Sequence, residues 1–232
     1  MKGIKKILGL AAFAVVFTFA TSTMASAQNV LGDILRRMDA NNKAMKSLKS
    51  TIKMDKVNAQ LGESDVSEGT VQYLPAPTKE KIRVRIDWTK PAVEHLSVGG
   101  GQYMLFRPRL QQAVVGKIDS TTKGNPSAGN ALAFMTMSRD QLKANYDVAY
   151  GGEATVNGSV RTWNLKLTPK TATSYKSAEL WVDSNGMPVQ AKVFEKNNDT
   201  TTIQLTNIEK NATIPGDVFS IKPPKGTKII PG

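Results

Sequence analysis

Residues 178–230 read AELWVDSNGMPVQAKVFEKNNDTTTIQLTNIEKNATIPGDVFSIKPPKGTKII. Apolar and polar residues alternate along much of this stretch with a period of two, which is typical of strands with one buried face. Turn-forming residues, such as Asp183-Ser184-Asn185-Gly186, separate the alternating segments. Because short turns join antiparallel neighbours, this part of the chain predicts an antiparallel sheet.

The alternating pattern extends back towards the N-terminus. Residues 82–88, IRVRIDW, are apolar at every even position and charged at every odd position. From Ser50 onward the period is two, and further segments are expected at 92–98, 102–106, 112–118, 146–150, 153–157, 160–168, 177–183, 188–196 and 199–208. About eleven short strands result, and so long an antiparallel sheet must curl, split or close to protect its edges.

Two helical segments accompany the strands. Residues 30–48 carry apolar side chains at spacings of three and four, which predicts an amphipathic helix, and residues 131–142 predict shorter helical pieces. Both have apolar faces that need a surface to cover. The predicted fold class is therefore α+β and mainly antiparallel β: an incomplete, strongly curved β-barrel of about eleven strands, with a helical lid over a hydrophobic cavity.

Residues 1–27 have the organisation of a secretory signal. Lys2, Lys5 and Lys6 precede an apolar stretch at 7–19, and Ala25-Ser26-Ala27 offers a cleavage site. We expect a cleaved signal peptide at 1–27, a single domain at 28–232 and a periplasmic location. An uncleaved membrane anchor is the alternative, which the shortness of the apolar stretch disfavours. The chain contains no cysteine, so it has no lipobox thiol and no disulfide.

The charge balance limits the partners. Without the three signal lysines, 28 basic and 19 acidic residues remain, a net charge of +9. Nucleic acid is not an expected partner, because the compartment is wrong and RNP-like and zinc-finger motifs are absent from the sequence. Basic residues concentrate at 79–85 and 107–109, which is most simply a soluble charged surface.

The sequence does not predict an enzyme. His95 is the only histidine, on an expected strand, where a structural role is favoured over a catalytic one. Gly-x-Ser-x-Gly and P-loop motifs are absent from the sequence, and its acidic residues, Glu94 among them, are spaced as solvated strand and turn residues. We therefore expect no catalytic residues, no metal site and no cofactor. Several of the nine methionines could line a flexible cavity, but on the residues alone they are more simply ordinary core.

A series of motifs in order resembles the LolA/LolB outer-membrane lipoprotein-sorting family over residues 31–231. The motifs are Trp88 with Pro91, the Gly99-Gly100-Gly101 turn, the strand at 103–106, Gln111 or Gln112, Leu165-x-Leu167-x-Pro169-Lys170, Leu180-Trp181-Val182-Asp183, Gly186-x-Pro188 and the tail Phe219-x-x-x-Pro223-Pro224-x-Gly226. The resemblance implies an incomplete barrel around a hydrophobic cavity with helices as its lid. It also implies a monomeric periplasmic carrier that binds the acyl chains of lipoproteins, or a related lipid, and ferries them to the outer membrane. An inner-membrane donor complex and an outer-membrane acceptor are the partners that it implies.

This chain departs from the family pattern in two places. Well-studied LolA carriers have an Arg-Pro pair after the Gly-led strand, and that arginine holds the lid shut, whereas this chain reads Leu74-Pro75-Ala76-Pro77. The turn before the glutamine, which is usually acidic or neutral, reads Arg107-Pro108-Arg109. The lid must therefore be held in another way, and a relative with a different lipid cargo remains an alternative.

Alternation and the resemblance together give a set of candidate binding residues. The expected cavity residues are Ile82, Val84, Ile86, Trp88, Leu96, Val98 and Leu105. The expected lid residues are Leu35, Met38, Leu132 and Met135. Two other functions remain as alternatives: a regulatory module that senses lipoproteins or lipid, and, less favoured, an exported hydrolase.

Overall fold

The computed structural model describes residues 22–76, 81–117 and 135–232. The helices include α1 (Ser22–Ala44) and α3 (Arg139–Asn145), with 3-10 turns η2 (Pro108–Leu110) and η3 (Gly216–Phe219). Twelve strands of the described chain form a single sheet. They are β1 (Leu48–Asn58), β2 (Glu63–Leu74), β3 (Arg83–Lys90), β4 (Glu94–Gly99), β5 (Gln102–Arg107), β6 (Gln112–Lys117), β7 (Tyr146–Val156), β8 (Val160–Pro169), β9 (Tyr175–Asp183), β10 (Pro188–Glu195), β11 (Thr200–Lys210) and β12 (Lys228–Pro231).

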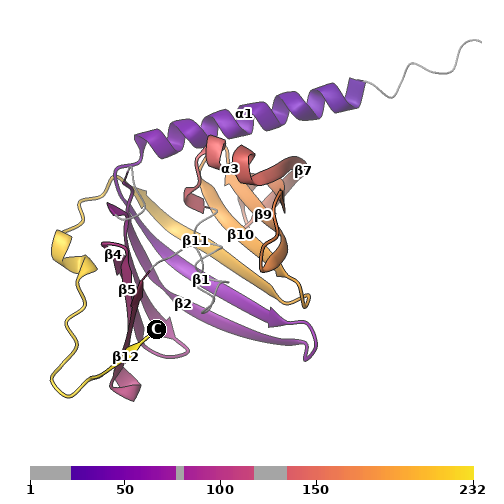
Figure 1. The fold of residues 1–232 in the computed structure, drawn as a ribbon. Helices are drawn as coiled ribbons and strands as arrows, with labels where there is room; N and C mark the ends of the chain where they lie inside the picture. The colour runs from indigo at the N-terminus through magenta and orange to yellow at the C-terminus, as the bar shows by residue number, and fades with distance from the viewer. Residues whose placement is uncertain (1–21, 77–80, 118–134) are drawn as a thin grey trace, which may run out of the picture.

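The sheet is open and strongly curved, and α1 crosses one end of it (Figure 1). The strand order is β12-β6-β5-β4-β3-β2-β1-β11-β10-β9-β8-β7, so two antiparallel runs, β1 to β6 and β7 to β11, are joined where β1 pairs with β11. The edge strands β7 and β12 do not pair with each other. The predicted fold class, an incomplete antiparallel barrel with helices across it, is confirmed.

Several predicted boundaries were wrong. The expected segments 146–150 and 153–157 are one strand, β7, because a bulge between Tyr150 and Gly152 lets the chain continue without a turn. The short C-terminal strand β12 was not predicted, and it pairs with β6 in parallel. The sheet therefore has twelve strands instead of about eleven.

The first helix also ends earlier than predicted. Helix α1 stops at Ala44, and Leu48, expected as its last residue, opens β1. The Asn211 side chain accepts a hydrogen bond from Lys46 N at 2.7 Å and donates one to Ala44 O at 3.3 Å. These bonds satisfy backbone groups at the helix end and turn the chain into the sheet. Most of the predicted signal segment lies outside the described residues, and α1 begins at Ser22, within it.

The main core lies between the helices and the concave face of the sheet. Ile34 and Met38 of α1 are completely buried, as are Ile52 of β1, Leu165 of β8 and Ile203 of β11. Fully burying one such side chain stabilises the fold by roughly 1.5–3 kcal/mol. The strands β1 and β8 to β11, together with α1 and α3, thus supply most of the completely buried side chains of the described residues.

A second, smaller cluster lies on the convex side of β3 to β6. The C-terminal segment crosses this side, where Phe219 of η3 is buried and its carbonyl oxygen accepts a hydrogen bond from the Ser97 hydroxyl. His95 stacks on Phe106 with ring centroids 6.1 Å apart, and its Nδ1 lies 2.5 Å from Asp87 Oδ1. This environment agrees with the structural role predicted for His95.

The pKa of the Asp87 carboxyl group depends on the same cluster. Burial alone would raise the pKa of Asp87, but hydrogen bonds from Arg85 and His95 outweigh burial and hold this pKa below its usual value. Asp87 is therefore ionised at neutral pH and anchors Arg85 as well as His95 on the convex side.

Helix α1 rests directly on the turn between β9 and β10. Gly186 in this turn has a φ of +78°, and a Cβ there would lie 2.3 Å from the carbonyl carbon of Arg37. The Arg37 guanidinium donates a hydrogen bond to Ser184 O at 3.0 Å. Only a glycine allows both the left-handed backbone and the close approach of the helix.

We predict that Gly186→Ala destabilises the protein more than Gly158→Ala and loosens α1. Gly158 has the same φ of +78°, but a Cβ there would meet nothing within 4 Å. The Gly158 variant should be destabilised only by the cost of placing alanine in the left-handed backbone conformation, about 1–2 kcal/mol of unfolding free energy. The Gly186 variant should lose more and should become sensitive to proteolysis within α1. Equal melting temperatures and equal cleavage of the two variants would contradict this packing.

Candidate functional site

The concave face of β3 to β6, here called the wing, carries its side chains in three cross-strand rows. Pairing of β3 with β4, β4 with β5 and β5 with β6 defines these rows. The first is Val84, Val98, Tyr103 and Gly116; the second is Ile86, Leu96, Leu105 and Val114; the third is Trp88, Glu94, Arg107 and Gln112. Two rows are apolar or aromatic, and the third, farthest from the β4–β5 turn, is largely polar.

The structure brings most of the predicted cavity residues together in these rows. Val84, Ile86, Trp88, Leu96, Val98 and Leu105 all lie on the concave face. Ile82 precedes β3 and is half-buried against the main core. A shift of register by one residue would have placed the set on the convex side, so the alternation assigned the inward face correctly.

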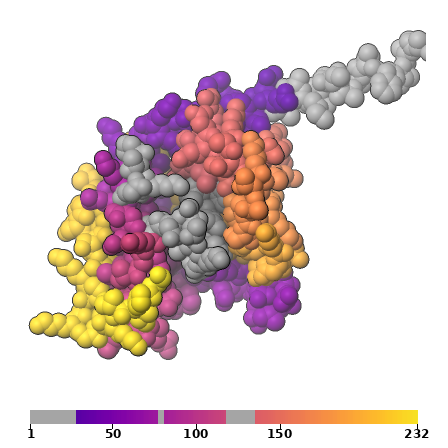
Figure 2. All heavy atoms as spheres, in the orientation of Figure 1, coloured from indigo at the N-terminus to yellow at the C-terminus, as the bar shows by residue number. Residues whose placement is uncertain are grey.

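The wing is less completely covered than the rest of the concave face. Ile86 and Trp88 are buried, but Val84, Leu96, Val98 and Leu105 are half-buried. In Figure 2 the wing and the strands β8 to β10 form separate flanks beneath α1. The wing therefore presents apolar surface that the described part of the chain does not fully cover.

The predicted lid residues cover the other half of the concave face. Leu35, Met38 and Met135 are 1%, 0% and 2% exposed and belong to the main core cluster. Leu132 lies outside the described residues. Helix α1 and residues 135–145, together called the lid, thus bury the strands that the wing adjoins.

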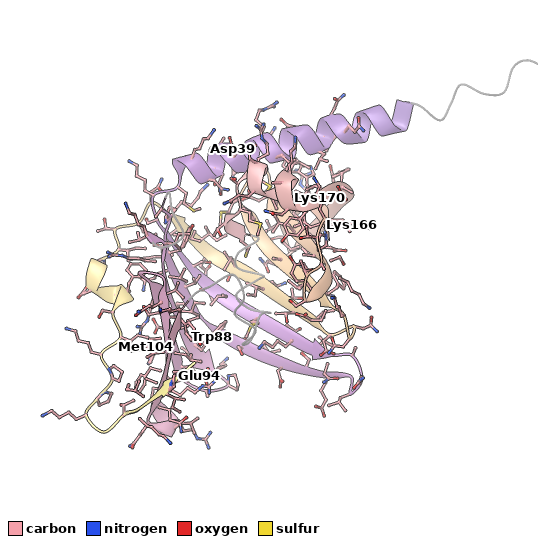
Figure 3. All side chains as sticks on the ribbon, in the orientation of Figure 1. Asp39, Trp88, Glu94, Met104, Lys166 and Lys170 are labelled. Atoms are coloured by element: carbon pink, nitrogen blue, oxygen red, sulfur yellow. The ribbon has the colours of Figure 1, made fainter. Side chains whose placement is uncertain are left out.

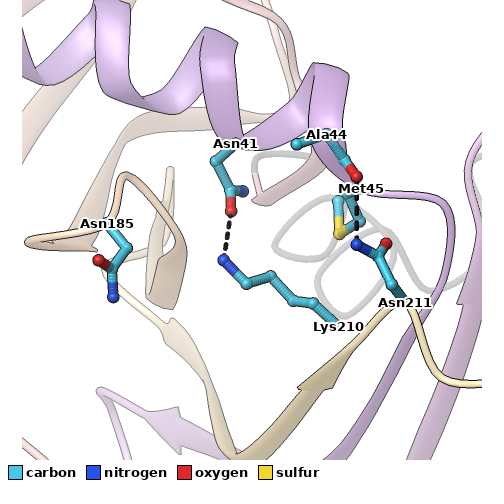
Figure 4. A pocket seen from close by; sticks show the side chains of 6 residues that line it. All are labelled: Asn41, Ala44, Met45, Asn185, Lys210 and Asn211. Atoms are coloured by element: carbon cyan, nitrogen blue, oxygen red, sulfur yellow. Dashed lines mark hydrogen bonds between the residues drawn. The ribbon is translucent and has the colours of Figure 1, made fainter.

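A few polar bonds tie the lid to the sheet. The Asn42 amide donates to Met137 O at 3.0 Å within the lid, and Lys210 Nζ of β11 donates to Asn41 Oδ1 at 2.9 Å. Figure 4 shows this last bond beside a pocket of about 230 Å³. The pocket is lined by Asn41, Ala44, Met45, Asn185, Lys210 and Asn211.

Tyr73, near the end of β2, makes a further tie to the lid. Its hydroxyl is hydrogen-bonded to the side chain of Thr136 in the lid. Burial raises the pKa of Tyr73 above its usual value, and the bond to Thr136 opposes this effect only in part. The hydroxyl is therefore protonated at neutral pH. Tyr73 directly precedes Leu74-Pro75, where the expected arginine is missing.

Sequence reasoning missed the third row of the wing. Glu94 was expected on a solvated face, but its carboxylate Oε1 lies 3.0 Å from Arg107 Nε on the concave side (Figure 3 labels Glu94 beside Trp88). Both side chains are about one-third exposed, at 33% and 37%. The signal was present in the sequence, because Glu94 has the same parity as Leu96, and Arg107 has the same parity as Leu105.

Within the three described ranges, acidic and histidine side chains do not gather in groups of three or more that could hold a metal ion. The helices of the same residues lack the combination of length and apolar character needed to cross a membrane.

Comparisons with known proteins agree with this geometry. The family model described as "Outer membrane lipoprotein carrier protein LolA" matches residues 65–222. A protein of Dechloromonas aromatica (strain RCB) named "Outer-membrane lipoprotein carrier protein" is 24% identical over 231 residues, covering 99% of this chain and 98% of that protein.

Two solved structures share the fold at low sequence identity. An uncharacterized conserved protein from Thermus thermophilus superposes with a TM-score of 0.53 at 10% identity, covering 88% of this chain and 99% of that one. The crystal structure of MucB gives a TM-score of 0.52 at 18% identity, covering 85% of this chain and 63% of that one. These likenesses establish the fold.

We predict that Tyr73→Phe loosens the lid without unfolding the sheet. Loss of one hydrogen bond of this kind costs about 0.5–1.5 kcal/mol, and the cost should fall on residues 135–145. Hydrogen–deuterium exchange measured by mass spectrometry should be faster in peptides from this segment. Tyr150→Phe, which removes the hydroxyl of a half-buried tyrosine in β7, is the matched control. Identical exchange in the two variants would show that Tyr73 does not hold the lid.

Proposed function

We propose a function for this chain from one established premise: it belongs to the LolA family of outer membrane lipoprotein carrier proteins. The proposed function is that of a periplasmic carrier. It would hold the acyl chains of lipoproteins, or of a related lipid, against the concave face of the wing and ferry them to the outer membrane. The proposal involves no catalysis, no metal and no cofactor.

The half-buried apolar rows of the wing carry this proposal. Val84, Leu96, Val98 and Leu105 form a continuous apolar surface beside a lid that is separate from the wing in sequence. Apolar surface that a fold leaves accessible commonly marks a binding site. An acyl chain that lies along these rows would bury the apolar side chains of the wing, as α1 buries those of the other strands.

Exchange of lipid between two apolar environments is energetically more favourable for a carrier than simple capture. Burying an acyl chain is worth about 0.8 kcal/mol per methylene, or roughly 12 kcal/mol for sixteen carbons. Three such chains would exceed the practical ceiling of about 18–21 kcal/mol for noncovalent affinity. A carrier that also releases its cargo therefore works best when lipid passes between two apolar environments, so that the net free energy of transfer is small.

The lid is suited to such an exchange. Its polar ties to the sheet are few. They include Tyr73 to Thr136, Asn41 to Lys210 and Arg37 to Ser184, and each contributes about 0.5–1.5 kcal/mol. In the proposed cycle, the bond between Tyr73 and Thr136 closes the empty protein in place of the missing arginine. When the lid opens, cargo covers the apolar side chains that the lid had buried.

The proposed cellular location of the protein is the periplasm. The N-terminal 27 residues have the pattern of a cleaved secretory signal, which supports a periplasmic location. A carrier that takes lipid from one membrane to another needs a donor and an acceptor. We therefore include an inner-membrane donor complex and an outer-membrane acceptor among the partners.

We predict that Val98→Glu weakens lipid binding by about tenfold or more, because a buried carboxylate beside acyl chains costs at least one to several kcal/mol. Since Val98 is only half-buried, the melting temperature should change little. Val66→Glu, at a 40% exposed position on the convex side of β2, is the control and should bind lipid like the wild type.

Both variants can be measured by titration with a fluorescent diacylated lipopeptide. Native mass spectrometry of protein purified from its own periplasm would identify the cargo that it carries. A wild-type protein that is empty and ignores added lipopeptide would exclude the carrier function. Equal binding by Val98→Glu and the wild type would exclude the wing as the acyl-chain site.

A further inference from the structure

The polar third row of the wing is not explained by acyl-chain binding. Glu94 and Arg107 lie on the same concave face as Leu96 and Leu105, two residues farther along their strands. A strand rises about 3.3 Å per residue, so the charged pair lies about 7 Å from the nearest apolar row. The basic turn that departs from the family pattern begins with Arg107.

The stability of the fold does not account for this pair. An ion pair about one-third exposed contributes at most about 1 kcal/mol. Apolar side chains at both positions would continue the neighbouring rows and would often be neutral or stabilising. Two charged groups beside the apolar rows of the inner face therefore indicate a binding role.

The Nε donor of Arg107 is ion-paired with Glu94 but poorly hydrogen-bonded on this face. Its Nε is buried and, although only 3.0 Å from Glu94 Oε1, makes no hydrogen bond of acceptable geometry within the described residues. Buried donors are almost always satisfied in proteins. An acceptor group held against the third row would satisfy this donor.

We propose that Glu94 and Arg107 bind the amide-bearing head of an acylated peptide and disfavour lipids with anionic phosphate heads. The inference rests on the proposed function, which places acyl chains on the two apolar rows. The head of a lipid lying there would reach the third row.

The chemistry of the two side chains defines the preferred head. A guanidinium only donates hydrogen bonds, and an ionised carboxylate only accepts them. A peptide group offers both a carbonyl oxygen for Arg107 and an N–H for Glu94, so it can replace the existing charge contact without leaving either group unpaired. A phosphate offers only acceptors and a negative charge. It would satisfy Arg107 but repel Glu94, which would lose its partner.

Two probes distinguish these heads. One is a dipalmitoylated lipopeptide with an uncharged peptide, and the other is dipalmitoyl phosphatidylglycerol, each titrated against the full-length protein. Wild-type protein should favour the lipopeptide. Arg107→Gln should weaken lipopeptide binding by about tenfold, the effect of losing one hydrogen bond to a charged group. Glu94→Gln should strengthen phosphatidylglycerol binding several-fold and reduce the preference between the two lipids.

The matched controls remove one positive and one negative charge at positions outside the third row. Arg109→Gln alters an exposed arginine in η2, and Glu63→Gln alters an exposed glutamate at the start of β2. Neither should change the ratio of the two affinities. Thermal melting of each variant checks that the fold is retained.

The outcomes separate this inference from the function on which it rests. Loss of lipopeptide binding in Val98→Glu, with unchanged ratios in Glu94→Gln and Arg107→Gln, would overturn the head-group site and leave the carrier function intact. Wild-type protein that prefers phosphatidylglycerol would also overturn the head-group site. Wild-type protein that binds neither lipid would overturn both proposals.

Discussion

Burial of the apolar concave face is the constraint on which the rest of this structure depends. One sheet presents apolar side chains inward from nearly every strand. Leaving that apolar surface exposed to water would cost free energy. Helix α1 and residues 135–145 pack in one core cluster with β1 and β8 to β11, where Ile52, Leu165 and Ile203 are completely buried. The wing has no comparable cover in the described chain. The fold is thus divided into a packed half that supplies stability and a less packed half, where we propose that acyl chains bind.

This division explains how a carrier can be both stable and adaptable. The packed half includes two fully buried residues of α1, Ile34 and Met38. The convex cluster around Phe219 and Phe106 holds the wing from behind, so the wing does not need a filled inner face to keep its shape. Under the proposed function, cargo of different shape would then be accommodated with little loss of unfolding free energy.

Much of this could be predicted from the sequence, because alternation with a period of two is a local signal. The pattern of residues 82–88 placed Val84, Ile86 and Trp88 on one face, and the structure has them there. Partners distant in sequence could not be inferred in the same way. The pairing of β1 with β11, the parallel strand β12 and the tie between Tyr73 and Thr136 depend on contacts that no local period encodes. The Glu94–Arg107 pair was missed because charged residues were assumed to face solvent, although their parity placed them inside.

The pairing of β1 with β11 also affects how the chain reaches its folded state. Leu48, at the start of β1, pairs with Lys210, at the end of β11, so the two halves of the sheet cannot join until most of the polypeptide is available. Pairings between strands so remote in sequence form slowly, because the loop-closure entropy must be overcome first. A polypeptide with this connectivity stays incompletely folded while its C-terminal part is still being synthesised. That delay suits a chain whose N-terminus has the pattern of an export signal.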